Sequence, residues 1–130
     1  MKLPYELVEA LASDVSPETR KHVALNTNTP NIILDRLADD PSPHVWVGVA
    51  DNYTASPATL QRLYRHGLAL SRKGNTEEVY QVEKLFRRLV ENRNLPVECL
   101  HSMLKNTDDE QLRQRASNAL SRRSKNLDRT

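Results

Sequence analysis

The chain has 130 residues, of which 28% are charged and 38% hydrophobic, which is typical of one ordered domain with a modest core. No apolar run is long enough to span a membrane, and the N-terminal MKLPYELVEA lacks the apolar segment of a secretory signal. The single cysteine, Cys99, excludes an internal disulfide and a multi-cysteine metal or cluster site, so we expect a cytoplasmic protein with no cofactor.

The formal net charge of +2 hides an asymmetry along the chain. Residues 1–61 carry four Lys or Arg against eight Asp or Glu, whereas residues 62–130 carry fifteen against nine. Such polarity can steer a partner with an acidic patch toward the second half. Solubilising charge on solvated helix faces explains the same pattern, so both interpretations stay open.

Prolines at regular intervals mark helix starts in the first half of the chain. Five of them follow one another at a nearly constant distance: Pro4, Pro17, Pro30, Pro43 and Pro57. Four follow a hydroxyl residue: Ser16, Thr29, Ser42 and Ser56. A Ser or Thr side chain can cap an orphan N–H, and Pro at the first helical position lacks an N–H that would have no partner there. The spacing therefore predicts one short helix after each of these prolines.

Two such helices make a unit of about 26 residues, a length within the range of helical repeats. Short strings recur at that distance, namely Leu11-Ala12 with Leu37-Ala38, Val23-Ala24 with Val49-Ala50, and Asn26 with Asn52. Apolar residues within each helix lie three or four apart, so each helix has one apolar stripe. No unit can bury its stripe alone, and neighbouring units must stack. We therefore predict an all-α fold, a short α-solenoid of stacked helical repeats.

The regular spacing breaks before residues 65–85. In the segment LQRLYRHGLALSRKG, Gly67 and Gly74 bracket the expected helix end. Asn75 with Glu78 then forms a predicted capping box for the helix that follows. We interpret residues 65–85 as a longer helical insertion, made of one bent helix or of two.

The repeat pattern returns after this insertion. LVENRNLP, residues 89–96, matches VALNTNTP, residues 23–30, in its two asparagines and its proline. Thr107 with Glu110 forms a second predicted capping box, which leads into the last helix. Residues 121–130 are polar and basic, and we expect them to fray.

The string LASDVSPETRKHVALNTNTPNIILDRLADDPSPHVWVGVADN resembles the leucine-rich repeat variant family. Units of that family read L-A-x-D, then V-R-x-x-V-A-x-N, then a joint like Asn-x-x-Thr-Pro. The resemblance implies alternating α- and 3₁₀-type helices in a right-handed superhelix without strands, related to HEAT and armadillo solenoids. It is good over residues 4–64, partial over 86–120 and absent over 65–85. Residues 1–120 are thus expected to form one HEAT-like domain.

Some members of that family carry an iron–sulfur cluster in a separate cysteine-rich segment, and one cysteine gives no basis for transferring it to this chain. The arginine that recurs in the family's units is replaced in part here. The equivalent positions are Arg20, Trp46, Phe86 and Arg113. Stacked units would place these residues in one row of cations and aromatic faces, and Trp and Arg are frequent interface anchors. Packing of Trp46 and Phe86 between units is the alternative.

The residues predicted to bind a partner are therefore Arg20, Trp46, Tyr53, Arg65, Phe86, Arg88 and Arg113. None of the four histidines has the spacing of a zinc-binding helix. Cys99 and His101 are two residues apart and would point in different directions on a helix. Paired acids such as Asp108-Asp109 stand beside turns, where they cap helices or face water. The sequence contains no pattern that argues for an enzyme or a metal site.

We therefore predict a non-enzymatic protein-interaction module, such as an adaptor, an inhibitor or an immunity-type protein. Its partner is expected to be a protein with an acidic patch, and self-association through a terminal helix is compatible with the two open ends of a solenoid. A nucleic-acid-binding HEAT-like protein is the alternative, because the second half is rich in arginine and could follow a phosphate backbone.

Overall fold

The structure of the chain, a computed structural model, describes residues 3–128, with side-chain surroundings described as far as residue 125. Within these residues it contains eight helices and no strand, which confirms the all-α prediction. The helices are α1 (Tyr5–Ala12), α2 (Pro17–Leu25), α3 (Asn31–Leu37), α4 (Pro43–Ala50), α5 (Pro57–Lys73), α6 (Thr76–Glu91), α7 (Val97–Asn106) and α8 (Glu110–Asp128). None of them is long and apolar enough to cross a lipid bilayer.

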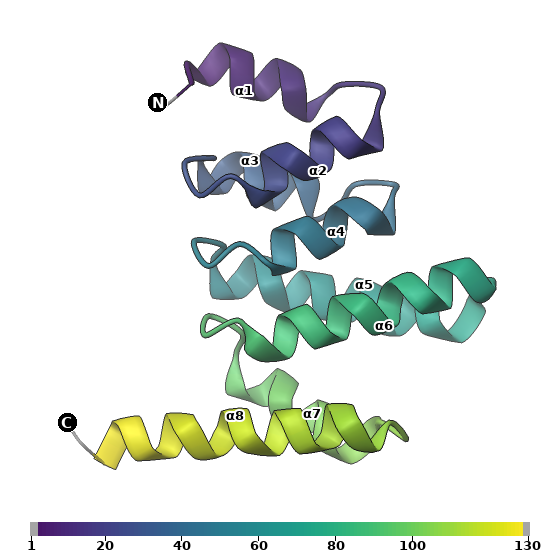
Figure 1. Cartoon of the computed structure of the whole chain (residues 1–130), viewed down its shortest axis with the longest axis vertical. Helices are drawn as coiled ribbons and strands as arrows, with labels where there is room; N and C mark the ends of the chain where they lie inside the picture. Colours follow the sequence, from purple (N-terminus) through teal and green to yellow (C-terminus); the bar gives the residue numbers. More distant parts are fainter. Residues whose placement is uncertain (1–2, 129–130) are drawn as a thin grey trace.

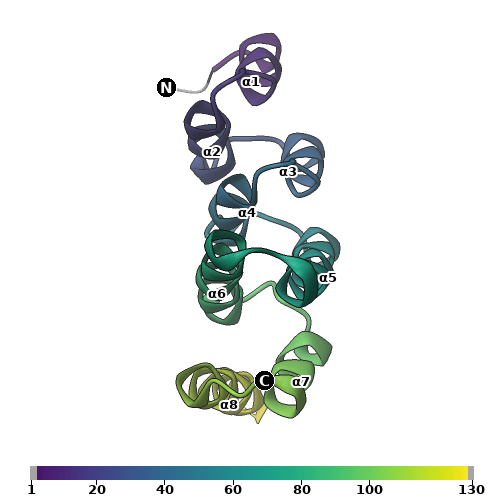
Figure 2. The ribbon, with the colours of Figure 1, turned by 90° about the vertical axis from the view of Figure 1, so that its right-hand side faces the viewer.

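The helices form two layers that run the length of the molecule (Figures 1 and 2). Helices α2, α4, α6 and α8 pack on one another in sequence, and each packs against the preceding odd-numbered helix. The core lies between the layers, where its largest fully buried side chains are Ile33, Leu34, Leu37, Leu60, Leu63, Leu85, Leu89, Leu95, Leu100, Met103, Val45 and Val49. All described helices are α-helices, including the short α3, so the 3₁₀-type helices implied by the family resemblance are absent from residues 3–128.

Proline stands at the start of six helices in two ways. Helices α2, α4 and α5 begin at Pro17, Pro43 and Pro57, as predicted. Helices α1, α3 and α7 begin one residue after proline, at Tyr5, Asn31 and Val97. In both arrangements the missing N–H falls where the helix has no partner to offer.

The predicted hydroxyl caps form at only one of the three Ser-Pro starts. The Ser56 hydroxyl accepts from the N–H of Thr59 (3.2 Å), whereas the side chains of Ser16 and Ser42 cap no helix N–H. The N–H groups of Ser16 and Ser42 donate instead to the carboxylates of Asp14 and Asp40, both at 2.8 Å. The aspartate two residues before each of these serines therefore closes the turn into the helix, and no side chain caps the first N–H groups of α2 and α4.

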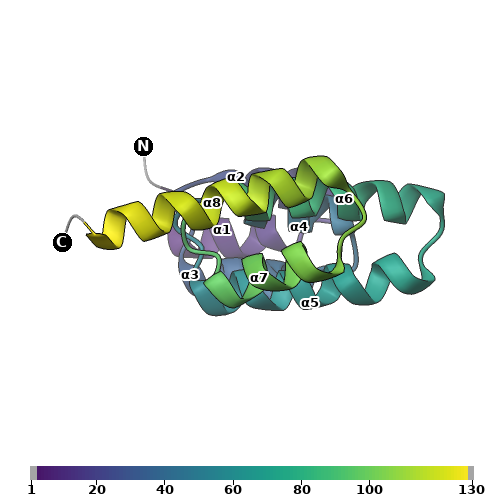
Figure 3. The same ribbon diagram turned by 90° about the horizontal axis from the view of Figure 1, so that it is seen from below.

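Residues 65–85 form two helices rather than one. Helices α5 and α6, of 17 and 16 residues, are joined at Gly74 and Asn75. The capping box of Asn75 and Glu78 is present. Gly67 lies inside α5, not at its end. This hairpin extends well beyond the shorter α3–α4 pair (Figures 1 and 3).

The last helix differs from the prediction at both ends. Asp109, not Thr107, caps α8, because its carboxylate accepts from the N–H groups of Gln111 (2.9 Å) and Leu112 (3.2 Å). The Thr107 hydroxyl accepts from the N–H of Asp109 at 3.0 Å, one step before the helix. Helix α8 then continues to Asp128, so residues 121–128 are helical where fraying was expected. Residues 129–130 lie outside the described residues.

Three equivalent asparagines occupy the connections from the even-numbered to the odd-numbered helices. The side-chain oxygens of Asn26, Asn52 and Asn92 each accept from the N–H two residues later, at 2.9 Å. The backbone oxygen of each asparagine also accepts from the backbone N–H three residues later. The same turn is thus built three times along the chain.

Two of these asparagines also join neighbouring layers of the stack. The Asn52 amide donates to the backbone oxygens of Ala24 (2.8 Å) and Asn26 (3.1 Å). The Asn92 amide donates to the oxygens of Ala50 (2.9 Å) and Asn52 (3.0 Å). They satisfy the Ala24 and Ala50 carbonyl groups, which lie at the ends of α2 and α4, and give the Asn26 and Asn52 carbonyls a second donor.

An arginine ends this series. The Arg123 guanidinium on α8 donates to the oxygens of Leu95 and Asn92, the latter at 3.0 Å. The Asn92 carbonyl therefore accepts a side-chain hydrogen bond from Arg123, just as the Asn52 carbonyl accepts one from Asn92. This contact ties the distal part of α8 to the stack, which explains why the helix persists through the expected tail.

Asn92→Ala should lower the free energy of unfolding by about 2 to 4 kcal/mol, because it leaves the buried Ala50 carbonyl without a donor and removes the bonds of the Asn92 side chain to the Asn52 carbonyl and the Asn94 N–H. Asn31 is exposed on α3. Asn31→Ala is therefore the control and should change the free energy of unfolding by less than about 0.5 kcal/mol. Urea unfolding followed by circular dichroism measures both. Equal effects of the two substitutions would contradict the structural role of Asn92.

Candidate functional site

Three residues predicted to bind a partner serve instead to fix the starts of their own helices. Arg20 Nη1 donates to the backbone oxygen of Asp14 (2.8 Å), Trp46 Nε1 to that of Asp40 (2.7 Å) and Arg113 Nη2 to that of Thr107 (2.7 Å). In each case the acceptor lies in the turn just before the helix. Arginine and tryptophan are interchangeable in this row because both present an N–H at similar reach.

Arg20 and Trp46 are further enclosed by their neighbours. The Arg20 guanidinium binds the Asp40 carboxylate through two bonds of 2.7 and 3.0 Å, and this hydrogen bonding raises the pKa of Arg20. Trp46 is 9% exposed and its ring lies 5.5 Å from the ring of His66. The structure therefore places Trp46 in the core, the packing alternative for the aromatics, and leaves it little surface for a partner.

Phe86, the fourth member of the row, makes no such bond and is only partly buried. Its ring lies 5.3 Å from the ring of Tyr64 on α5. Gly67 on α5 allows this approach, because a Cβ there would lie 2.7 Å from Phe86 Cε1. The ring thus leans against α5 on one side and is open on the other.

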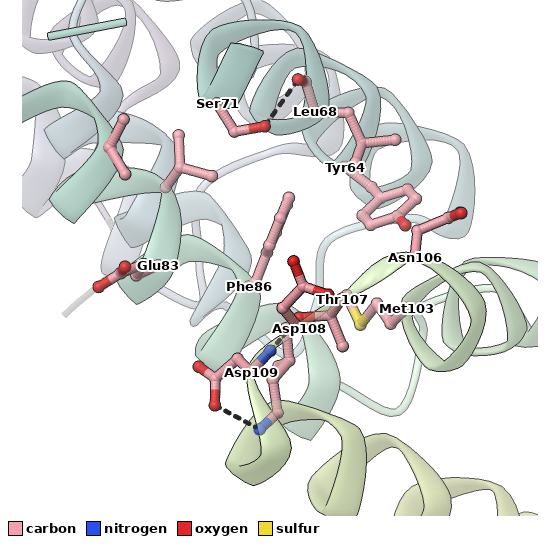
Figure 4. Close-up of a pocket in the computed structure, with 13 residues that line it drawn as sticks. Tyr64, Leu68, Ser71, Glu83, Phe86, Met103, Asn106, Thr107, Asp108 and Asp109 are labelled. Carbon is pink, nitrogen blue, oxygen red and sulfur yellow. Dashed lines mark hydrogen bonds between the residues drawn. The ribbon is translucent and has the colours of Figure 1, made fainter.

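The open side of Phe86 faces a hollow of about 360 Å³ between the α5–α6 hairpin and helices α7 and α8 (Figure 4). We call it the α5–α8 groove. Its apolar and aromatic lining consists of Tyr64, Leu68, Val79, Val82, Phe86, Met103 and Leu112. Its polar lining consists of Ser71, Glu83, Asn106, Thr107, Asp108 and Asp109. An apolar floor with a few polar groups at its margin is the usual composition of a ligand pocket.

The polar margin of the α5–α8 groove is acidic. Three lining residues are carboxylates and none is a Lys, Arg or His. Asp109 is occupied in capping α8. The side chains of Glu83 and Asp108 form no hydrogen bond or ion pair with any other described residue, and both residues are exposed. These two carboxylates are therefore free to accept from a ligand.

Tyr64 forms one wall of the groove and remains a neutral phenol. Its hydroxyl shares a hydrogen bond of 2.7 Å with the Ser102 hydroxyl. Burial raises the pKa of Tyr64, against a smaller lowering by the Ser102 bond. The wall is thus uncharged at physiological pH, and the charge of the groove comes from its margin alone.

The remaining predicted residues lie elsewhere. Tyr53, 72% exposed, and Arg88 line a separate hollow of about 590 Å³ at the connections after α4 and α6, together with Arg93 and Glu91. Arg65 is exposed on α5 and lines neither hollow. The seven predicted residues therefore do not form one surface, and only Phe86 belongs to the α5–α8 groove.

Potential metal ligands do not cluster within residues 3–128. No group of three His, Cys, Asp or Glu side chains is close enough to hold a metal ion within that range. His44 pairs with Glu18 and His66 with Asp39, each at 2.9 Å on the surface. The partners in these two pairs are 26 and 27 residues apart in the chain.

Sequence reasoning missed the groove, although one signal pointed to it. The interval from Asn52 to Asn92 exceeds the interval from Asn26 to Asn52 by about four helical turns, or two for each helix of a pair. An insertion of that length predicts a hairpin longer than its neighbours, whose extra apolar residues need a partner.

Comparisons of this chain with protein-family models, with curated proteins and with solved structures find no match. The resemblance to the leucine-rich repeat variant family therefore stays a prediction.

Gly67→Ala should move the Phe86 ring toward the groove, because the new methyl would overlap the ring edge. The gain of about 1 kcal/mol expected for Gly→Ala inside a helix should be largely offset by this clash. Ala69→Gly, exposed on the same helix, reports the propensity difference alone. Unfolding measurements and the Phe86 ring resonances in NMR test this. A full gain in stability with unchanged resonances would contradict the close contact.

The Cys99 thiol should react slowly in the native protein. Cys99 is 4% exposed, and burial raises its pKa, so little thiolate is accessible. We expect its reaction with Ellman's reagent to be roughly a hundredfold slower in buffer than in denaturant. Because Cys99 is the single cysteine, the signal has one source. Equal rates would show that α7 is not packed as described.

Proposed function

We propose that this chain is a non-enzymatic protein-interaction module whose α5–α8 groove receives a segment of a protein partner. In this proposal the chain is a short, right-handed, HEAT-like α-solenoid related to the leucine-rich repeat variants. Its units of about 26 residues have the length usual for such repeats. The cytoplasm, expected from cysteine usage, is part of the same proposal.

The repeat architecture is supported by bonds that recur at equivalent positions. The turns at Asn26, Asn52 and Asn92 share the same side-chain bond. Arg20, Trp46 and Arg113 share the bond to a backbone oxygen in the turn before their helix. Equivalent contacts between successive units are what a linear stack of repeats requires.

The observation that carries the binding proposal is the apolar hollow beside Phe86, in whose lining Leu68, Val79 and Phe86 are only half-buried. A folded chain normally covers such a surface, and exposed apolar hollows with a polar margin mark sites of interaction. The floor remains open because the α5–α6 hairpin extends past its neighbours, so no other repeat covers the added turns (Figures 1 and 3).

Nucleic-acid binding is less well supported by the arrangement of the basic residues. About half of the described arginine side chains in the second half have partners within the chain. Arg62 pairs with Asp35 and Asp39, Arg115 and Arg122 lie near Glu91, and Arg123 binds backbone oxygens. Arg88 and Arg93 are exposed and line the second hollow, so a partner's acidic patch would fit there better than at the acidic groove.

A random-peptide display selection tests the binding proposal. Val79→Trp fills the groove from α6. Val97→Trp places the same side chain at an exposed position of α7 outside the groove. Peptides selected on the wild-type protein should lose binding to Val79→Trp by at least about tenfold and keep it for Val97→Trp. The measurement is fluorescence anisotropy of the selected peptides.

Three results would count against the proposal. Selection of no peptide, or retention of all selected peptides by Val79→Trp, would remove the groove as a docking site. A mobility shift with oligonucleotides that falls steeply with salt would instead favour the alternative function.

A further inference from the structure

We propose that the segment bound by the α5–α8 groove carries a large apolar side chain with a lysine or arginine beside it. This inference rests on the proposed function and adds the chemistry of the partner. It follows from which groups line the groove, which of them are already occupied, and what the surrounding cations do.

The acidic margin is a local reversal of charge. Residues 62–130 carry fifteen Lys or Arg against nine Asp or Glu, yet the groove they form is lined by three carboxylates and no cation. Glu83 comes from α6 and Asp108 from the connection between α7 and α8, and Figure 4 shows them on different sides of Phe86. Both are without a partner among the described residues. Two such acceptors suit an ammonium or guanidinium group.

Two cations on the same helices are engaged elsewhere, and Arg87, one turn from Glu83 on α6, does not line the groove. Arg113 on α8 donates to the Thr107 oxygen and pairs with Glu110. The Lys84 ammonium on α6 lies 4.9 Å from the centre of the Tyr80 ring. Neither lines the groove, so neither supplies the charge that Glu83 and Asp108 can accept.

The apolar floor of the groove favours a ligand with a large apolar side chain. A volume of about 360 Å³ lies near the lower end of the range for ligand pockets, so it holds one or two side chains rather than a long helix. Phe86 lines the groove together with the two carboxylates, and the aliphatic stem of Lys or Arg can pack on its ring while the charged end reaches the margin. An apolar residue and a neighbouring cation together therefore satisfy both parts of the groove.

The charge pattern predicts the salt dependence. The protein as a whole has a net charge of +2, so it does not attract a basic segment over long distances. The attraction acts only at contact, and exposed ion pairs are individually weak. The apolar contact should therefore supply most of the affinity, and the cation most of the preference between peptides.

The test compares peptides selected by display on the wild-type protein and on variants of the full chain. Glu83→Lys with Asp108→Lys reverses the margin, and Glu6→Lys with Glu98→Lys makes the same charge change at exposed positions outside the groove. Wild-type and control selections should be enriched in Lys or Arg beside an apolar residue. The reversed margin should shift that enrichment to Asp or Glu and keep the apolar residue.

A milder pair of variants measures the size of the effect. Glu83→Gln with Asp108→Asn removes the charges and nearly preserves the shapes, and Glu6→Gln with Glu98→Gln is its control. Affinity of a wild-type-selected peptide should fall by about two- to thirtyfold for the first pair and stay unchanged for the second. Thermal unfolding by circular dichroism checks that all four double variants fold.

The outcomes separate the two proposals. Apolar enrichment without a charge preference, or a basic preference that the reversed margin leaves intact, would overturn this inference and keep the docking groove. Absence of apolar enrichment would overturn the proposed function itself. Concentration-dependent dimerisation of the wild-type protein that Val79→Trp abolishes would assign the groove to a second copy of the chain, and would also overturn this inference.

Discussion

The rest of the structure depends on how helix ends are satisfied inside a stack. A helix leaves its last carbonyl groups without intrahelical partners, and stacking would bury those of α2 and α4. The side-chain amides of Asn52 and Asn92 solve this by donating to the helix end below while their oxygens close their own turns. One residue type thereby sets both the local turn and the spacing between layers. Arg123 closes the series because its guanidinium has the donors that asparagine would otherwise provide.

A stack with this joint tolerates longer helices without losing register. Helices α5 and α6 carry about two extra turns each, and the turn at Asn92 still meets the carbonyl groups of Ala50 and Asn52. Whole turns return the apolar stripe to the same face, so the core continues. The cost is that the added turns have no equivalent in the neighbouring layers. Some of their apolar residues, such as the half-buried Val79, therefore line a groove beside Phe86.

The row of Arg20, Trp46, Phe86 and Arg113 shows how far sequence reasoning reaches in such a protein. Its members could be aligned from spacing, but alignment cannot say whether a side chain turns toward solvent or back toward its own helix start. Three of them turn back to a carbonyl group, where an N–H of either arginine or indole is sufficient. Phe86 has no N–H to donate, and it alone was left to line the groove. The sequence shows that Phe86 lacks an N–H donor, but it does not show which carbonyl groups the other three side chains bind.

Helix content, helix starts and the repeated joint were determined by the sequence, because proline, asparagine and the apolar period act over a few neighbouring residues. Local chemistry also set the break between α5 and α6, where Asn75 and Glu78 cap each other. The groove, its acidic margin and the engagement of most arginines were decided only by tertiary structure. They depend on which side chains from helices far apart in the chain come within reach, and that distance is set by stacking rather than by spacing along the chain.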